Sequence, residues 1–189
     1  MRKWCVVFLA AWGVAVSSIG KHDPSLGEAA SRRFKLCERM LANLPARATG
    51  TFVQRKTLAD VGVTITSSGT FCIVKDKSFE WRTLKPLPST FAATPESYTI
   101  TANGKSSTRS LAELKLSAGL RSLVKGDLSA LKDVFDVTEA EYRLVLVPKT
   151  RELSEFVKRA TLEGTDFPSR FTLDYSTGDR LEIDLVQSR

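Results

Sequence analysis

The stretch SGTFCIVKDKSFEWRTLKPLPSTFAATPESY, Ser68 to Tyr98, decides the fold because its apolar and polar residues alternate with a period of two. In SFEWRT this alternation puts Phe79 and Trp81 on one face of a strand and the charged side chains on the other. The charged turn at 75–77 and the prolines of KPLPST separate this strand from its neighbours. Short consecutive strands joined by tight turns predict an antiparallel meander.

The same period continues outward from this stretch in both directions. Upstream it runs through TGTFVQRK and VGVTITSSGTFCIV, and downstream through TFAAT, SYTITA and KSSTR, the last two joined by the hairpin signal Asn103-Gly104. Further along, we expect strands in YRLVLV and SEFVKRATLEG, and a hairpin in SRFTLDYSTGDRLEIDL. In that hairpin, one apolar row should face another: Phe171, Leu173 and Tyr175 opposite Leu181, Ile183 and Leu185.

Two regions carry the period of a helix instead. The first begins at a capping box of Ser25 and Glu28, or at Asp23-Pro24, and ends near Pro45, with an apolar stripe of Ala30, Phe34, Cys37, Leu41 and Leu44. The second lies between the two groups of strands and begins at a capping box of Ser110 and Glu113. Its apolar side chains are Leu111, Leu114 and Ala118, followed by a short helix from Asp127 with Leu128, Leu131, Val134 and Phe135.

This order of elements predicts a mostly β fold with helices. Five or so strands, a helical insertion and four more strands could close or nearly close into an antiparallel barrel, with the helices covering an open end. A curved sheet of this size can enclose a cavity for an apolar ligand.

The first 20 residues have the form of a secretory signal peptide. Arg2 and Lys3 precede an apolar run from Trp4 to Val16, which is shorter than the roughly 20 residues that span a bilayer. We expect cleavage before Lys21, with a cut near Ser17 as the alternative. The remaining residues, 21–189, then form a single exported domain, and the formal charge falls from +7 to +5 because two cations are lost. For an exported chain, an anionic membrane surface or an acidic partner is a better expectation than nucleic acid.

Cys37 and Cys72 remain after such cleavage, and an oxidising compartment allows them to pair. Two buried free thiols are an equally good interpretation.

Few residues in the sequence suggest catalysis. The one histidine, His22, lies beside the predicted cleavage site, so no Ser-His-Asp or Cys-His arrangement is expected. No cluster has the spacing of zinc ligands, and no glycine-rich phosphate loop is present. Carboxylate pairs such as Asp174 with Asp179, or Glu182 with Asp184, are typical of the exposed side of a hairpin. We therefore expect a binding protein without enzymatic activity, cofactor or metal.

Five short motifs, in this order, resemble the LolA family of periplasmic outer-membrane lipoprotein carriers. They are Gly50-Thr51-Phe52-Val53-Gln54, Ser67-Ser68-Gly69-Thr70-Phe71, Phe79-Glu80-Trp81-Arg82, Lys85-Pro86 and Leu146-Val147-Pro148-Lys149. The resemblance covers nearly all of residues 21–189. It implies an incomplete antiparallel barrel closed by a helical lid, in the periplasm of a Gram-negative bacterium.

In this family, a monomeric carrier takes the acyl chains of lipoproteins from an inner-membrane ABC transporter complex and gives them to an outer-membrane lipoprotein acceptor. The resemblance implies that Phe79 and Trp81 line or flank the mouth of an apolar cavity. The family's lid arginine falls on Lys75, which lacks the planar fork of donors. This departure is typical of a divergent member whose cargo is a lipoprotein or another lipid.

The remaining candidates for the cavity come from neighbouring strands and from the predicted lid: Phe52, Phe71, Phe91, Leu111, Leu114, Leu128 and Leu131. An aromatic pair on one strand face is also typical of ordinary core. The alternative function is therefore a non-catalytic interaction module of the cell envelope, with a packed barrel and an acidic protein partner.

Overall fold

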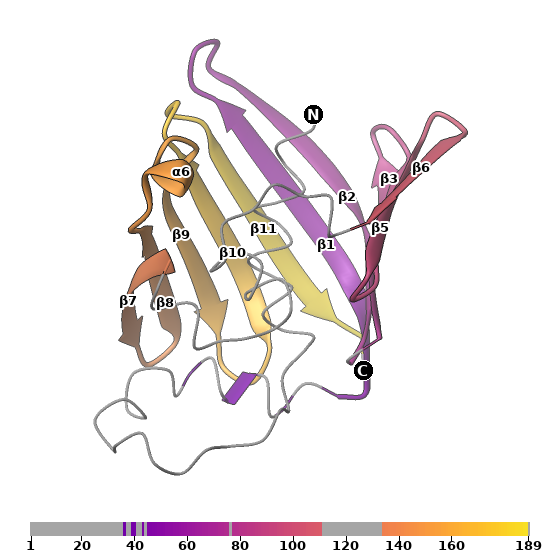
Figure 1. Cartoon of the computed structure of the whole chain (residues 1–189), viewed down its shortest axis with the longest axis horizontal. Helices are drawn as coiled ribbons and strands as arrows, with labels where there is room; N and C mark the ends of the chain where they lie inside the picture. The colour runs from indigo at the N-terminus through magenta and orange to yellow at the C-terminus, as the bar shows by residue number, and fades with distance from the viewer. Residues whose placement is uncertain are drawn as a thin grey trace.

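The computed structural model describes residues 36, 39–40, 43, 45–75, 77–110 and 134–188. In these residues, eleven antiparallel strands form one sheet in the order β6-β5-β4-β3-β2-β1-β11-β10-β9-β8-β7. Figure 1 shows this sheet as a curved layer. Every neighbouring pair except β1 and β11 is also consecutive in the chain, so the sheet consists of two meanders joined along the β1–β11 pair.

The first meander, from β1 to β6, comprises β1 (Arg47–Leu58), β2 (Val63–Val74), β3 (Ser78–Lys85), β4 (Ser89–Ala93), β5 (Ser97–Ala102) and β6 (Lys105–Ser110). The second comprises β7 (Phe135–Ala140), β8 (Arg143–Pro148), the short helix α6 (Arg151–Ser154), β9 (Val157–Gly164), β10 (Pro168–Tyr175) and β11 (Arg180–Gln187).

Alternation along each strand gives the sheet an apolar inner face and a polar outer face. The inner face carries the buried side chains, for example Phe52, Phe71, Ile183 and Leu173. The predicted register of the last hairpin is confirmed, because Phe171 pairs with Ile183 and Leu173 pairs with Leu181.

Ion pairs cover the outer face of the second meander. Asp184 binds Arg55 and Arg170, each at 2.6 Å, and Asp174 binds Arg159 at 2.7 Å. The hydrogen bond from Arg55 is the main reason why the pKa of Asp184 is lowered. These partly exposed pairs fix the orientation of the outer side chains more than they add stability.

The sheet stays open because β6 cannot face a core. The inner positions of β6 are Lys105, Ser107 and Arg109, as the pairing with β5 shows, and all three are exposed. Closing the barrel over β6 would take two charges out of water without partners, which is costly. Charged edge strands of this kind also prevent unwanted pairing between molecules.

The predicted antiparallel, unclosed sheet of consecutive strands is confirmed, with several corrections. The strand β7 was missed: Phe135 begins this strand instead of ending a helix. The short helix α6 also went unpredicted. Leu36 and Met40 are helical and buried, and neither belongs to the predicted stripe. The signal peptide, that stripe and the proposed lid helices, up to residue 133, lie outside the described residues.

Two glycines on the inner face make room for aromatic rings. A Cβ atom built on Gly69 would lie 1.9 Å from the carbonyl oxygen of Arg82 and 2.9 Å from the ring of Phe52. A Cβ on Gly50 would lie 2.4 Å from the ring of Phe71. The aromatic side chains therefore lie over bare backbone, an arrangement that also shields the glycines from water.

Replacing Gly69 by alanine should destabilise the protein by about 2–4 kcal/mol, because the β2–β3 ladder must separate to admit the methyl group. Urea denaturation measures this loss as a change in the free energy of unfolding. Thr70→Ala, on the outer face of the same strand, is the control and should cost much less. Equal losses for the two variants would contradict the packing described here.

Candidate functional site

The inner face of the first meander is aromatic across four neighbouring strands. Phe52 lies on β1, Phe71 on β2, Phe79 and Trp81 on β3, and Phe91 on β4. The register places Trp81 between Phe71 and Phe91 as direct cross-strand partners. All five residues were predicted as cavity candidates from the sequence, and the structure brings them together on one face.

Their rings form a continuous series of contacts. Trp81 stacks on Phe52 with 3.7 Å between ring centroids, and lies 6.4 Å from Phe71 and 6.1 Å from Phe79. Phe91 lies 6.1 Å from both Phe79 and Tyr98, which extends the series onto β5. Such contacts add to the area that each ring buries. We call the set Phe52, Phe71, Phe79, Trp81, Phe91 and Tyr98 the aromatic cluster.

Exposure changes along the aromatic cluster. Trp81 is 7% exposed and Phe79 6%, whereas Phe91 is only partly buried, and Ile100, its cross-strand partner on β5, is 36% exposed. Tyr98 on β5 is 8% exposed, so the more open part of the cluster is the area around Phe91 and Ile100. The second meander continues the inner face with aliphatic side chains, mainly Leu144, Leu146, Leu173, Leu181 and Leu185.

One cation lies on the inner face near the β1–β2 turn. Lys56 is 9% exposed, and its Nζ atom lies 3.5 Å from the carboxylate of Asp179 and 5.2 Å from the centre of the Tyr175 ring. Burial lowers the pKa of Lys56, and Asp179 partly offsets this. Asp179 also accepts a hydrogen bond from the backbone N–H of Ala59 at 3.0 Å. This group therefore ties the β1–β2 turn to the β10–β11 turn.

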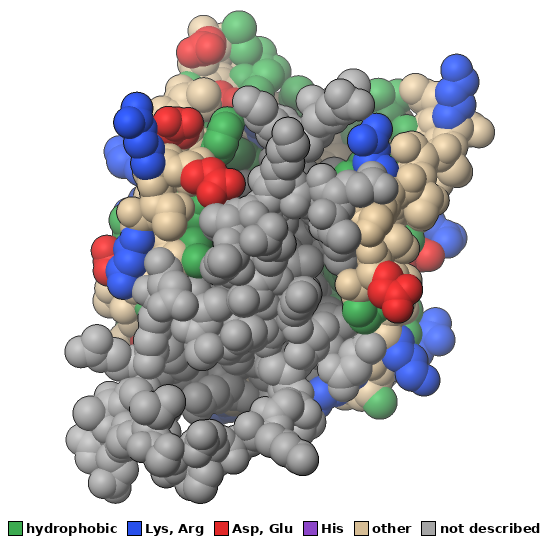
Figure 2. Space-filling model, in the orientation of Figure 1, with side chains coloured by type: hydrophobic (Ala, Val, Ile, Leu, Met, Phe, Trp, Pro, Cys, Tyr) green, Lys and Arg blue, Asp and Glu red, His purple; other side chains and the backbone are tan. Residues whose placement is uncertain are grey.

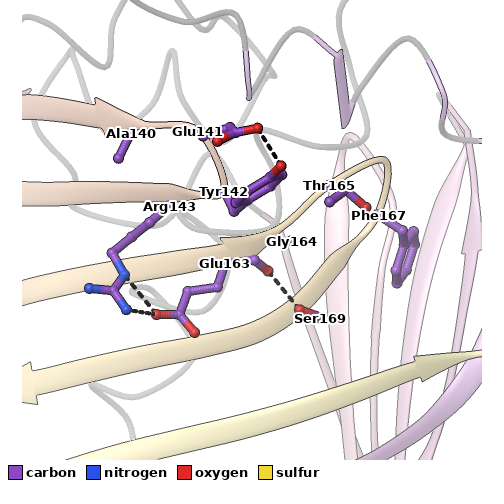
Figure 3. A pocket seen from close by; sticks show the side chains of 9 residues that line it. All are labelled: Ala140, Glu141, Tyr142, Arg143, Glu163, Gly164, Thr165, Phe167 and Ser169. Atoms are coloured by element: carbon purple, nitrogen blue, oxygen red, sulfur yellow. Dashed lines mark hydrogen bonds and ion pairs between the residues drawn. The ribbon is translucent and has the colours of Figure 1, made fainter.

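A pocket of about 590 Å³ opens at the opposite end of the sheet, between the β7–β8 and β9–β10 turns (Figure 3). Arg143 and Glu163 form an ion pair at its side, at 2.7 Å, and Tyr142 donates a hydrogen bond to Glu141. Arg39 donates to the carbonyl oxygens of both turns, at 3.3 and 3.4 Å. The charged groups of this pocket are thus already engaged with one another, so the pocket offers little free charge for chemistry.

The other predicted site residues are not part of the aromatic cluster. Lys75 follows β2, is half-buried and donates its backbone N–H to the carbonyl of Ala46 at 3.0 Å. Cys72 is a free thiol whose position in β2 faces outward, so it forms no disulfide in this structure. Its suggested partner Cys37, and the lid residues Leu111, Leu114, Leu128 and Leu131, lie outside the described residues.

Three residues of the inner face escaped the sequence analysis. Tyr98 and Lys56 each fall on the same side of a strand as a recognised apolar residue, so the alternation in SYTITA and TGTFVQRK could have identified them. Phe167 could not be found in this way, because it lies in the turn before β10. Its ring stacks on Phe71 at 5.9 Å.

Within the described residues, no three His, Cys, Asp or Glu side chains are grouped so as to hold a metal ion. Nor does any helix in that part of the chain have the length and apolar character needed to cross a membrane.

No family model and no curated protein matches the chain. Among solved structures, it is similar to the LolA superfamily protein NE2245 from Nitrosomonas europaea, with a TM-score of 0.45 and 10% identity over 80% of this chain and 89% of that one. It is also similar to a domain named for outer membrane lipoprotein sorting, from Vibrio parahaemolyticus (TM-score 0.44, 7% identity, 84% and 92% covered).

A third similar structure is the MucA/MucB complex of Pseudomonas aeruginosa, with a TM-score of 0.42 and 14% identity over 80% of this chain and 56% of that one. At TM-scores below 0.5 and identities of 14% or less, these likenesses assign neither a family nor a function to this chain.

The Tyr175 ring beside Lys56 should make stability depend on pH in the alkaline range. Burial raises the pKa of Tyr175 to about 12, so between pH 10 and 12 the unfolded chain loses this proton more readily than the folded protein. The stabilisation is therefore complete below pH 10 and is lost as the pH rises through 12. After allowance for solvent screening, the loss should be about 1–2 kcal/mol.

Chemical denaturation of the wild type and of Tyr175→Phe, at several pH values from 8 to 12, measures this loss. The variant should show a shallower decline in the free energy of unfolding above pH 10. Identical declines in the two proteins would show that Tyr175 ionises as easily in the folded state as in the unfolded chain.

Proposed function

We propose that the protein is a non-catalytic carrier that binds the apolar chains of a lipid or lipidated protein against the aromatic cluster. The single observation that carries this proposal is the inner face itself: six aromatic side chains form a continuous series of contacts on an open, curved sheet, and one of them, Phe91, is partly exposed beside the exposed Ile100. An open sheet can admit a ligand at its edge, which a closed barrel with a filled interior cannot do.

The energetics of an acyl chain suit such a face. Burial of a chain is worth about 0.8 kcal/mol per methylene group, so a fully enclosed long chain would be released too slowly for transport. A ligand that displaces packed rings recovers only part of this free energy, because the rings lose contacts with one another. Moderate affinity of this kind suits a protein that must both accept and deliver its cargo.

The route of transport belongs to the same proposal. We infer that the chain is exported to the periplasm of a Gram-negative bacterium after removal of residues 1–20. There it accepts cargo from an inner-membrane ABC transporter complex and delivers it to an acceptor in the outer membrane. Lys75, at the end of β2, is the proposed latch for a covering segment. The predicted signal peptide and the LolA resemblance of the sequence motifs support this route.

A second candidate is an interaction module whose inner face is permanently packed and whose basic surface binds an acidic protein. The stacking of Phe52 on Trp81, at 3.7 Å, is the observation in its favour, because rings in such contact leave no space between them. The formal charge, +7 for the full chain and +5 without residues 1–20, favours an acidic partner.

Trp81 provides a direct test, since the other two tryptophans, Trp4 and Trp12, lie in the segment predicted to be removed. Adding fatty acids brominated along the chain should quench Trp81 fluorescence if the acyl chain reaches the aromatic cluster. Phe91→Glu should weaken this binding at least tenfold, because it places a carboxylate at the open side of the cluster. Thr70→Glu, on the exposed outer face of β2, is the matched control and should bind like the wild type.

Thermal melts of the three proteins check that the variants fold. Native mass spectrometry of the protein purified without detergent, followed by lipid extraction, then identifies the class of cargo. A folded wild type that shows neither quenching nor bound lipid would contradict the carrier and favour the interaction module.

A further inference from the structure

One end of the sheet gathers most of the exposed apolar side chains. Because alternate connections of a meander lie at the same end, the turns after β1, β3, β5, β8 and β10 share this end, as Figure 1 shows. Ten large apolar side chains are exposed in the described residues, and three of them, Val61, Val63 and Ile65, share the β1–β2 hairpin, while Leu84, Leu87, Val147 and Phe156 lie at or beside the turns after β3 and β8. Exposed apolar side chains gathered on one hairpin indicate an interaction site, whereas single scattered ones need no explanation.

The β1–β2 hairpin projects farthest at this end. β2 pairs with β3 only from Ser68 onward, so Val63 to Ser67 have β1 as their only strand neighbour. β1 in turn pairs with β11 only as far as Thr57. The turn itself contains Gly62 with a φ of 64°, which allows the chain to reverse direction tightly. Figure 2 shows hydrophobic atoms gathered along this projecting tip.

The three most projecting apolar side chains are strongly exposed. Val61 is 65% exposed, and Val63 and Ile65 are each 49% exposed. Val63 and Ile65 lie about 7 Å apart along β2, and Val61 lies in the turn beyond them, so the tip is comparable in length with the depth of about 5–10 Å that interfacial segments reach in a bilayer. A protein partner would need roughly 800 Å² of contact for a stable complex, and a two-stranded tip offers far less.

The charges around the tip fit an anionic surface. Lys85 ends β3 and Lys105 begins β6, so both lie at this end of the sheet, and neither forms an ion pair with the described residues. Asp60, in the tip, is the one anion of the β1–β6 half at this end. The other charged side chains near the tip are paired, Lys56 with Asp179 and Arg55 with Asp184.

We propose that the β1–β2 hairpin inserts its tip into the interface of an anionic lipid bilayer. Val61, Val63 and Ile65 enter the boundary between head groups and acyl chains, while Lys85 and Lys105 contact the anionic head groups. The inner face begins directly below this tip, since Ile65 is the cross-strand partner of Lys56 on that face. The hairpin thus holds the end of the inner face against the membrane, whatever the cargo.

Vesicle flotation tests this proposal with the processed protein, its N-terminus confirmed by mass spectrometry. Vesicles of phosphatidylethanolamine with about one third phosphatidylglycerol should bind the wild type, and binding should weaken as salt is added. The triple variant Val61→Thr, Val63→Thr and Ile65→Thr keeps β-branched side chains and should lose at least tenfold in partitioning. The matched control, Val186→Thr, changes a valine that is also 65% exposed but lies near the opposite end of β11, and should bind like the wild type.

A charge variant should change vesicle binding in the opposite direction from the triple variant. Asp60→Lys should raise binding to the anionic vesicles severalfold and leave binding to neutral phosphatidylcholine vesicles nearly unchanged. A wild type that does not float, or a triple variant that floats as well as the wild type, would overturn the proposal. So would a dimer that the triple variant abolishes without any change in flotation, because the tip would then bind a second copy.

Fluorescence quenching by brominated fatty acids in solution should stay unchanged in the triple variant, which separates this test from that of the carrier.

Discussion

The stacking of Phe52 on Trp81 across Gly69 is the contact on which the inner face depends. The ring of Phe52 can reach Trp81 because the residue between them in the sheet has no side chain. Phe71 lies over Gly50 in the same way. Close approach of rings to bare backbone lets β1, β2 and β3 share one aromatic surface, on which Phe79, Phe91 and Tyr98 continue the contacts toward β6.

Charged side chains on the outer face and on β6 explain why the aromatic surface lies on only one face of the sheet. Charged pairs around Asp184 and Asp174 hold the outer side chains of the second meander, and the β6 edge keeps its charges in water. The sheet is therefore curved and apolar on one side, yet it does not close into a barrel. The proposed binding of an apolar chain depends on this curvature and on the open edge.

Most of the strands could be predicted from the sequence because the period of two is unbroken in segments such as SFEWRT and SYTITA, and because Asn103-Gly104 defines its hairpin. The strand β7 was missed because Val134 and Phe135 also continue a helical spacing, and local pattern cannot decide between the two. Phe79 and Trp81 were predicted to share a face because alternation within one strand fixes it. Phe52, Phe71 and Phe91 were candidates whose facing the sequence left open, because alternation does not say which side of each separate strand faces the core. Phe167 was not a candidate, because a turn residue has no periodicity, and only the curvature of the sheet brings it to Phe71.

The junction between β1 and β11 has a consequence for how the molecule forms. All other strand pairs join strands that follow one another in the chain. The β1–β11 pair instead joins residues far apart in the sequence, such as Gly50 and Gln187. Closing so large a loop is slow compared with forming local hairpins. Each meander can therefore assemble on its own, and their joining along β1 and β11 is the step that creates the continuous inner face. The aromatic cluster lies wholly on β1 to β5 and can form within the first meander, so this joining adds the aliphatic half of the inner face.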